Sequence, residues 1–255
     1  MEKERTSDLE VLPFWKGACE ALISELNVRG GFLVVPSAPS LCQAAEESVL
    51  WNAHLKADYA IMDSGFLALL FRIQGIKPPP RISGHQFIER LFLHAEDMTP
   101  SLKSRGFLWV VPDVAEKERI CAFLQRSEWD ITRQTFYVPP FYGKDEEFHD
   151  AVLLEAASSR DVDWVVLCIG GGRQEKLGGF LRESLGRAKV IVATGAAIAF
   201  FTGGQAPIPR WADRLYLGWL VRSLHAPGRF FPRYFSAFRL LWLLPCLLRN
   251  APRNA

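Results

Sequence analysis

Short apolar runs alternate with longer amphipathic segments over most of the chain. The apolar runs, rich in Val, Ile, Leu and Phe, predict six buried strands. They lie at residues 32–36, 58–62, 107–111, 135–138, 164–169 and 189–193. Between them, apolar residues at helical spacing predict helices at residues 43–56, 66–73, 86–94, 114–126, 144–158 and 173–185. Strands that alternate with helices form βαβ units, so the pattern predicts an α/β, Rossmann-like fold with a mostly parallel sheet flanked by helices.

The pattern changes after Gly204. The residues that follow are aromatic and helical in spacing, and prolines at positions 207, 209, 227, 232 and 245 interrupt them. We therefore predict two parts: an α/β core at residues 1–204 and a basic helical C-terminal appendage at residues 205–255.

Composition and charge sharpen this division. The 255 residues carry a formal net charge of +2, with 49% hydrophobic and 23% charged residues, as in a folded globular protein. The near-neutral total excludes a nucleic-acid binder that works by bulk charge. Residues 202–255, however, hold eight arginines, one aspartate and no lysine, a net of +7, whereas the first 201 residues carry −5. This asymmetry predicts an anionic partner for the basic segment.

The cysteines and histidines indicate no metal. The five cysteines are widely spaced without a CxxC pair, and the five histidines are scattered, so neither a disulfide framework nor a metal site is predicted. The charged first residues lead to no long apolar run, and the most apolar late stretch, 234–248, is shorter than the roughly 20 residues that span a bilayer. We expect a cytoplasmic protein whose tail lies on a membrane.

Asp63 follows the second predicted strand directly. In open parallel sheets, ligands bind beyond the carboxyl ends of the strands. A carboxylate at that position can act as a general base or orient a hydroxyl nucleophile. It can equally cap the helix that follows.

Three glycines follow the fifth predicted strand, at Gly170, Gly171 and Gly172, and a helix begins after them. Glycines let a ligand approach the backbone, and free N–H groups at a helix N-terminus bind phosphate. The pattern is neither GxGxxG nor a P-loop, so it indicates neither a dinucleotide site nor a Walker-type site. A tight turn without a ligand is the alternative. Gly195, after the last strand, permits close ligand approach or close helix packing equally well.

Arginines near these positions suit a phosphate. Arg81 adjoins a proline run, and a guanidinium matches phosphate oxygens, although most such arginines are simply solvated. In the tail, Arg214, Arg222, Arg229 and Arg233 have spacings that place them near one helical face, among Trp and Phe residues. A basic amphipathic segment with aromatic residues is typical of membrane-surface binding. The alternative is a C-terminal helix packed on the core with its arginines in water.

Together these motifs resemble the WecG/TagA/CpsF family of bacterial glycosyltransferases, from about residue 30 to residue 235. The family's strand–glycine–helix motif ends in Lys-Gln-Glu, which here stands as Arg173-Gln174-Glu175. The other matched positions are Ala57-Asp58, Asp63, Arg81, Gly84, Gly195, Phe200, Arg210-Trp211, Arg214, Trp219, Arg222, Pro227, Arg229 and Arg233-Tyr234.

The resemblance implies an enzyme that moves a hexose or N-acetylhexosamine from a UDP-sugar to a polyprenyl-diphosphate-linked sugar, in exopolysaccharide, capsule or teichoic-acid-like biosynthesis. It implies Asp63 as the catalytic base of an inverting transfer. Donor and acceptor binding are implied for Ser37, Arg81, Gly170, Gly171, Gly172, Arg173, Gln174, Glu175 and Gly195.

The resemblance also implies a peripheral protein on the inner face of the cytoplasmic membrane. Its appendage would bring Arg214, Arg222, Arg229 and Arg233 to the diphosphate and the lipid surface. Neither a metal nor another cofactor is implied, nucleic acid is not an expected partner, and a homo-oligomer is left open.

Several family positions are altered in this chain. Ser64 replaces the glycine after the proposed base, Ser37 replaces an asparagine, and Ala199 replaces the aspartate before Phe200. A changed donor or acceptor is one explanation. The alternative function is a catalytically degenerate, membrane-associated binding or scaffold protein of a polysaccharide assembly system. Retention of Asp63 and of the Gln-Glu pair favours the enzyme.

Overall fold

Six short strands form one sheet in the computed structural model, which describes residues 12–142, 148–204, 218–225 and 227–243. All neighbouring strands are parallel, in the order β2-β1-β6-β5-β3-β4. They are β1 (Gly31–Val34), β2 (Tyr59–Ala60), β3 (Phe107–Val110), β4 (Gln134–Tyr137), β5 (Trp164–Leu167) and β6 (Val190–Ala193). Each overlaps one of the six predicted runs. The predicted α/β, Rossmann-like fold with a parallel sheet is therefore confirmed.

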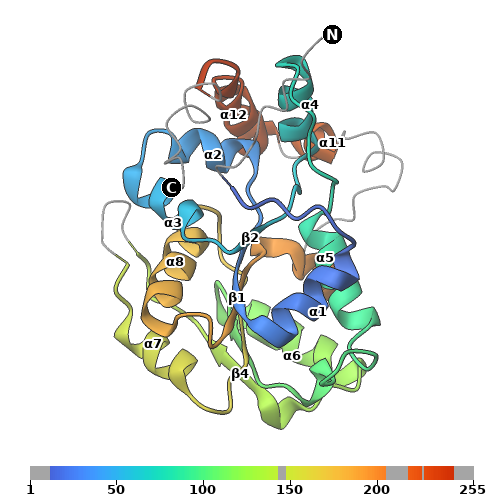
Figure 1. Cartoon of the computed structure of the whole chain (residues 1–255). Coiled ribbons are helices and arrows are strands. Elements are labelled where there is room, and N and C mark those ends of the chain that lie inside the picture. The colour runs from blue at the N-terminus through green and yellow to red at the C-terminus, as the bar shows by residue number, and fades with distance from the viewer. Residues whose placement is uncertain (1–11, 143–147, 205–217, 226, 244–255) are drawn as a thin grey trace, which may run out of the picture.

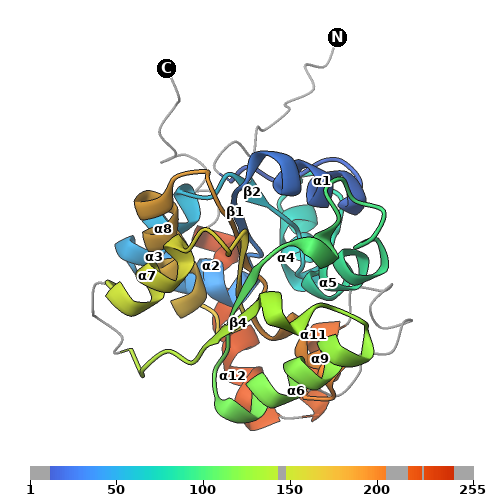
Figure 2. The same ribbon diagram turned by 90° about the horizontal axis from the view of Figure 1, so that it is seen from below.

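Helices cover both faces of this sheet (Figures 1 and 2). One layer holds α1 (Cys19–Arg29), α5 (Gly84–Leu93) and α6 (Val114–Arg126). The other holds α2 (Ala38–Ala44), α3 (Ser48–Leu55), α7 (Ala151–Ser158) and α8 (Arg173–Leu185). The remaining elements are α4 (Gly65–Ile73), α9 (Ala199–Thr202), α11 (Gly218–His225), α12 (Pro227–Ala237) and the short 3₁₀ turns η1 (Leu102–Ser104), η2 (Ile131–Arg133) and η3 (Gly195–Ala197).

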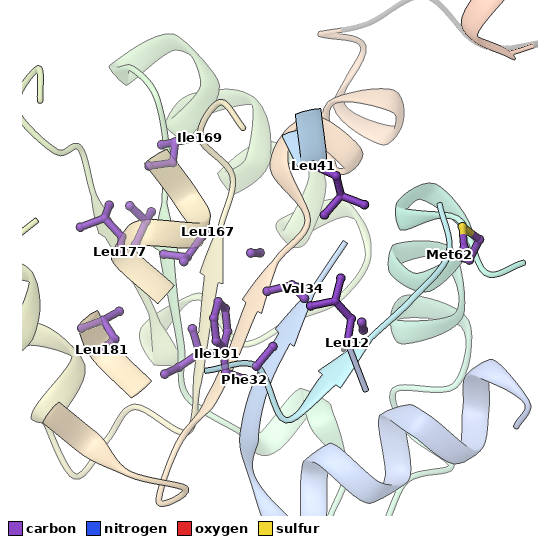
Figure 3. Packing of buried hydrophobic residues seen from close by; sticks show 14 of the residues in the cluster. Leu12, Phe32, Val34, Leu41, Met62, Leu167, Ile169, Leu177, Leu181 and Ile191 are labelled. Atoms are coloured by element: carbon purple, nitrogen blue, oxygen red, sulfur yellow. The ribbon is translucent and has the colours of Figure 1, made fainter. Parts of the chain in front are cut away.

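Alternate side chains of each strand pack against the two layers. Phe32 and Val34 of β1 lie in the cluster that contains Leu177 and Leu181 of α8, whereas Leu33 lies in the cluster on the opposite face. Figure 3 shows Phe32 and Val34 in the first of these clusters. Because the four inner strands β1, β3, β5 and β6 are buried on both faces, they contain no charged residue and are almost continuously apolar, whereas the edge strand β4 is partly exposed and begins with Gln134 and Thr135.

Two of the predicted helices differ from the helices in the structure. The segment predicted as one helix at residues 43–56 is α2 and α3, which a turn through residues 45–47 separates. α7 begins at Ala151 because the carboxylate of Asp150 accepts the N–H of Leu153 at 2.9 Å and caps the helix there. The earlier part of that predicted helix, at residues 144–147, lies outside the described residues. Helix α1 was not predicted.

The described part of the appendage packs on the core. Phe66 of α4 contacts three of its rings, with centroid distances of 5.1 Å to Trp219, 5.9 Å to Tyr234 and 5.0 Å to Phe238. Leu240 is fully buried in the same cluster as the sheet. The predicted division at residues 204 and 205 stays a prediction, and the described appendage shares its hydrophobic core with the first part.

Polar contacts fasten the appendage as well. Gln74, at the end of α4, donates its side-chain N–H to the carbonyl oxygen of Leu241 at 2.6 Å. Arg239 forms an ion pair with Glu46 at 2.5 Å. Within the part of the chain that the structure describes, no helix has the length and apolar character needed to cross a bilayer.

An ion cluster around the buried carboxylate of Asp58 lies at the amino-terminal edge of the sheet, where Arg182 is partly buried and Arg187 is exposed. The Asp58 carboxylate accepts hydrogen bonds from Arg182 Nε at 2.6 Å, from Arg187 Nε at 2.9 Å and from the Phe32 N–H at 2.9 Å. Burial alone would raise the pKa of Asp58, but these hydrogen bonds outweigh it and hold the pKa below its ordinary value of 3.8. Asp58 thus joins α8 and β1 and has a structural role.

We expect D58N to cost about 2 to 3 kcal/mol of folding free energy, because it leaves the partly buried guanidinium group of Arg182 without its carboxylate. The Asp58 pKa is lower in the folded protein than in the unfolded chain. The contribution of Asp58 to the folding free energy is therefore complete above about pH 4 and is lost as the pH falls through the folded-state pKa. Urea unfolding between pH 3 and 7 measures this, and D58N should show a shallower acid loss than wild type. Equal acid loss in both would contradict the assignment.

Candidate functional site

The predicted site residues gather at the carboxyl edge of the sheet. Ser37 follows β1, Asp63 follows β2, the three glycines follow β5 and Gly195 follows β6. β2, β1, β6 and β5 are consecutive neighbours in the sheet. Loops after consecutive parallel strands emerge at one edge, which is where open α/β sheets bind ligands.

Asp63 is held by the segment before α5. Its Oδ1 accepts the N–H of Gly84, the first residue of α5, at 2.8 Å. Arg81 Nε donates to the Asp63 carbonyl oxygen at 3.2 Å, and Met62 pairs with Arg81 in an isolated parallel bridge. The following helix α4 is capped by Ser64 instead, which accepts the N–H of Leu67 at 3.2 Å. The capping alternative for Asp63 therefore does not apply to α4.

Gly84 places this carboxylate close to two other strand ends. A Cβ atom on Gly84 would lie 3.5 Å from the Ala197 Cβ, 3.7 Å from the Thr194 carbonyl oxygen and 3.7 Å from Val35 Cγ1. The Asp63–Gly84 hydrogen bond therefore lies beside the ends of β1 and β6. Asp63 and the segment from Arg81 to Gly84 form one part of the site.

The three glycines differ in their roles. Gly172 has a φ of +87°, which favours glycine, and its N–H donates to Glu175 Oε2 at 2.6 Å. Gly170 and Gly171 are exposed, and a Cβ atom on either would meet no atom within 4 Å. Gly172 therefore shapes the turn before α8, while Gly170 and Gly171 leave open space at the start of that helix.

Two buried polar atoms without hydrogen-bond partners lie on the segments that follow β5 and β6. Gln174 is 5% exposed and Thr194 is 7% exposed, and both Gln174 Oε1 and Thr194 Oγ1 are buried without a hydrogen-bond partner. Gly195, with a φ of +59°, has its Cβ position 3.3 Å from Gln174 Oε1. Buried polar atoms without partners are costly, so a ligand that satisfies them gains affinity.

Charged groups flank the first turn of α8. Arg173 lies over the ring of Phe141, 4.6 Å from its centroid. Lys176 is buried, forms an ion pair with Glu47 and lies 5.0 Å from the centroid of Phe148. Burial lowers the pKa of Lys176. Its contact with Glu47 joins α8 to the start of α3, so Lys176 has a structural role.

Ser37 has a structural contact of its own. Its hydroxyl oxygen accepts the Ser40 N–H at 3.3 Å and caps α2. The structure thus brings together Asp63, Arg81, Gln174, Glu175 and Gly195 at one edge, and it uses Ser37 to start a helix there.

The tail arginines are described only in part. Arg214 lies outside the described residues. Arg222 belongs to α11, and Arg229 and Arg233 belong to α12. α12 contacts α2 and α11 contacts α4, so both helices lie at the carboxyl end of the sheet (Figure 1).

Two features of this edge were not predicted. Glu116 of α6 is buried, accepts Arg119 Nε at 2.8 Å and accepts the Thr202 hydroxyl at 3.1 Å. Burial, and secondarily the charge of Glu116, raises the pKa of the Cys168 thiol. Asp113 caps α6, so Glu116 lies in the first turn of this helix, where acidic residues are common. The sequence therefore gives no sign that Glu116 is buried.

An aromatic stack lies next to Gly84. The His85 ring is stacked on Phe201 with centroids 4.6 Å apart and meets Phe200 edge-on at 5.4 Å. The only sequence signal for this stack is that His85 directly follows the Arg81–Gly84 motif. Among the described residues, no group of three His, Cys, Asp or Glu side chains could hold a metal ion.

The parallel sheet, with helices on both faces and polar groups at its carboxyl edge, defines a Rossmann-like α/β protein. The sequence model of the glycosyl transferase WecG/TagA/CpsF family matches residues 10–254, nearly the whole chain. The chain belongs to this family of glycosyltransferases, as the sequence motifs predicted. No curated protein matches it.

Proposed function

We propose that the protein transfers a hexose or N-acetylhexosamine from a UDP-sugar to a polyprenyl-diphosphate-linked sugar in cell-surface polysaccharide biosynthesis. The observation that carries this proposal is the position of Asp63. Its Oδ1 is fixed by the Gly84 N–H, beside the ends of β1 and β6. Gln174 at the neighbouring strand end presents an unsatisfied oxygen of the kind that binds a sugar hydroxyl.

In this mechanism Asp63 is the general base. The acceptor hydroxyl attacks the anomeric carbon of the donor sugar and gives its proton to Asp63. The bond from that carbon to the UDP oxygen breaks, and the UDP leaves with the bonding electron pair. A single displacement inverts the configuration at the anomeric carbon.

Negative charge grows on the departing diphosphate. The open turn at Gly170 and Gly171 leads to the N-terminus of α8, whose N–H groups and partial positive charge suit phosphate oxygens. In the proposal Arg81 and Arg173 bind donor phosphates, and Arg214, Arg222, Arg229 and Arg233 contact the acceptor diphosphate or the lipid headgroups.

Exposed apolar residues of the appendage support a membrane-surface location. Phe231, Phe235 and Trp242 are 61%, 70% and 72% exposed, and Leu69 and Ile73 of the neighbouring α4 are also exposed. Aromatic residues in a segment of net charge +7 suit an anionic bilayer. The proposed location is the inner face of the cytoplasmic membrane.

Replacing Phe231, Phe235 and Trp242 together with Ser is expected to weaken binding to anionic vesicles by about a hundredfold or more, since each side chain loses roughly 1.5–3 kcal/mol of apolar transfer. Vesicle co-sedimentation measures this. The matched control replaces Val28, Leu93 and Val152, which are similarly exposed on α1, α5 and α7, with Ser. Equal loss in both variants would show that general hydrophobicity, rather than this surface, binds the lipid.

The test of the activity is UDP release with several UDP-sugars and a polyprenyl-diphosphate-linked acceptor. Release that requires both substrates, with an inverted product, supports the proposal. Vesicle binding without release for any pair would favour a membrane-associated scaffold of a polysaccharide assembly system.

A further inference from the structure

The unsatisfied oxygen of Gln174 has a fixed orientation, and its neighbour Glu175 sets it. Glu175 is 1% exposed, and both of its carboxylate oxygens face donors of the protein. Oε2 accepts the Gly172 N–H at 2.6 Å, and Oε1 accepts the Gln174 Nε2 at 3.1 Å. A buried carboxylate with this pattern is occupied by the protein and does not itself contact a ligand.

A carboxylate can only accept hydrogen bonds. The NH₂ group of Gln174 must therefore turn toward Glu175, and the amide oxygen must turn away from it. That oxygen is the buried atom without a partner. The partial positive charge at the start of α8 favours the negative charge of Glu175 at this position, the third residue of the helix.

We infer that Glu175 is a positioning residue that makes Gln174 a hydrogen-bond acceptor, so that this subsite takes a donor group of the ligand. The inference rests on the proposed function and deepens it, since the ligand group is then a hydroxyl of the donor sugar. A phosphate oxygen offers no proton at this point and is excluded from the subsite. The diphosphate must bind elsewhere, toward the open turn at Gly170 and Gly171.

The E175Q variant tests this polarity with almost no change in shape. Gln at position 175 can still accept the Gly172 N–H, but its other terminal atom is an NH₂ group. The Gln174 amide then turns over, offers its oxygen to Gln at 175 and presents its NH₂ to the ligand. The subsite changes from an acceptor to a donor.

A series of UDP-sugars, each with one sugar hydroxyl replaced by fluorine, can detect this change. Fluorine takes the place of the hydroxyl but cannot donate a hydrogen bond. Wild-type protein should bind one member of the series roughly tenfold more weakly than the parent UDP-sugar, the value of one hydrogen bond. In E175Q this ratio should fall to near one, as titration calorimetry measures. A purely structural role of Glu175 would weaken all members equally and leave the ratio unchanged, which would overturn the inference.

Two controls accompany the comparison. E118Q makes the same chemical change at an exposed position of α6 and should keep the wild-type ratio. Q174M removes the amide while keeping an unbranched side chain. The affinity ratio between the parent UDP-sugar and its fluorinated analogue should therefore also fall to near one in Q174M. If E175Q does not fold, as its thermal melting would show, Q174M carries the same test, and an unchanged ratio in it overturns the inference.

The amide orientation has a readout that needs no ligand. The side-chain NH₂ resonances of Gln174 in a ¹⁵N spectrum should shift in E175Q and stay unchanged in E118Q. Unshifted resonances would contradict the positioning role. A wild-type protein that binds no UDP-sugar would contradict the proposed function and the ligand part of the inference, while this measurement still decides whether Glu175 orients Gln174.

Discussion

D63N is expected to lower turnover by about a thousandfold while donor binding stays near the wild-type value, since general base catalysis contributes roughly 10²–10⁴-fold. The Asn side chain has nearly the same shape, and its oxygen can still accept the Gly84 N–H. The variant therefore keeps the local structure and loses the proton acceptor. Rates of UDP release and titration of UDP into the protein measure the two effects separately.

Asp113 offers a matched control. It follows β3 at the same edge of the sheet and caps α6 through the Glu116 N–H at 2.7 Å. Asn caps a helix as well as Asp does, so D113N should retain wild-type turnover. Unchanged turnover in D63N, or equal losses in the two variants, would refute the assignment of Asp63 as the base.

Removal of residues 205–255 is expected to destabilise the remaining protein strongly. The deletion uncovers Phe66, which now lies under three aromatic rings, and removes Leu240 from the core. Each large apolar side chain that loses its burial costs about 1.5–3 kcal/mol. Several such losses are a large part of the roughly 5–15 kcal/mol that stabilises a domain.

Thermal melting measures this expectation. Truncation after residue 204 should lower Tm by about 10 °C or more, at roughly 2–4 °C per kcal/mol for a chain of this size. An unaltered Tm for residues 1–204 would show that the core is independent of the appendage.

The strands could be predicted from sequence because the physics there is simple. A strand buried on both faces must be apolar throughout, as Val165, Val166 and Leu167 of β5 are. The start of α7 could not be placed in the same way, because it depends on one capping carboxylate, Asp150. Periodicity alone does not show where a cap interrupts a helical pattern.

The position of the candidate residues after the strands could be predicted from the sequence, but their contacts could not. Strand ends point to Asp63 and to the glycine turn, since parallel strands present their carboxyl ends together. The partner of Asp63 is Gly84, twenty-one residues away in the chain. Likewise, the unsatisfied oxygen of Gln174 depends on how Glu175 turns the amide. Such long-range or orientational contacts have no local signature in the sequence.

Asp63 and Phe66 are separated by one turn of chain, which carries the start of α4. The proposed base therefore lies in the same short segment as the ring that anchors the appendage. In the proposed function, this segment sets the distance between the lipid surface and Asp63. We therefore expect acceptors with one sugar more or fewer to be poorer substrates.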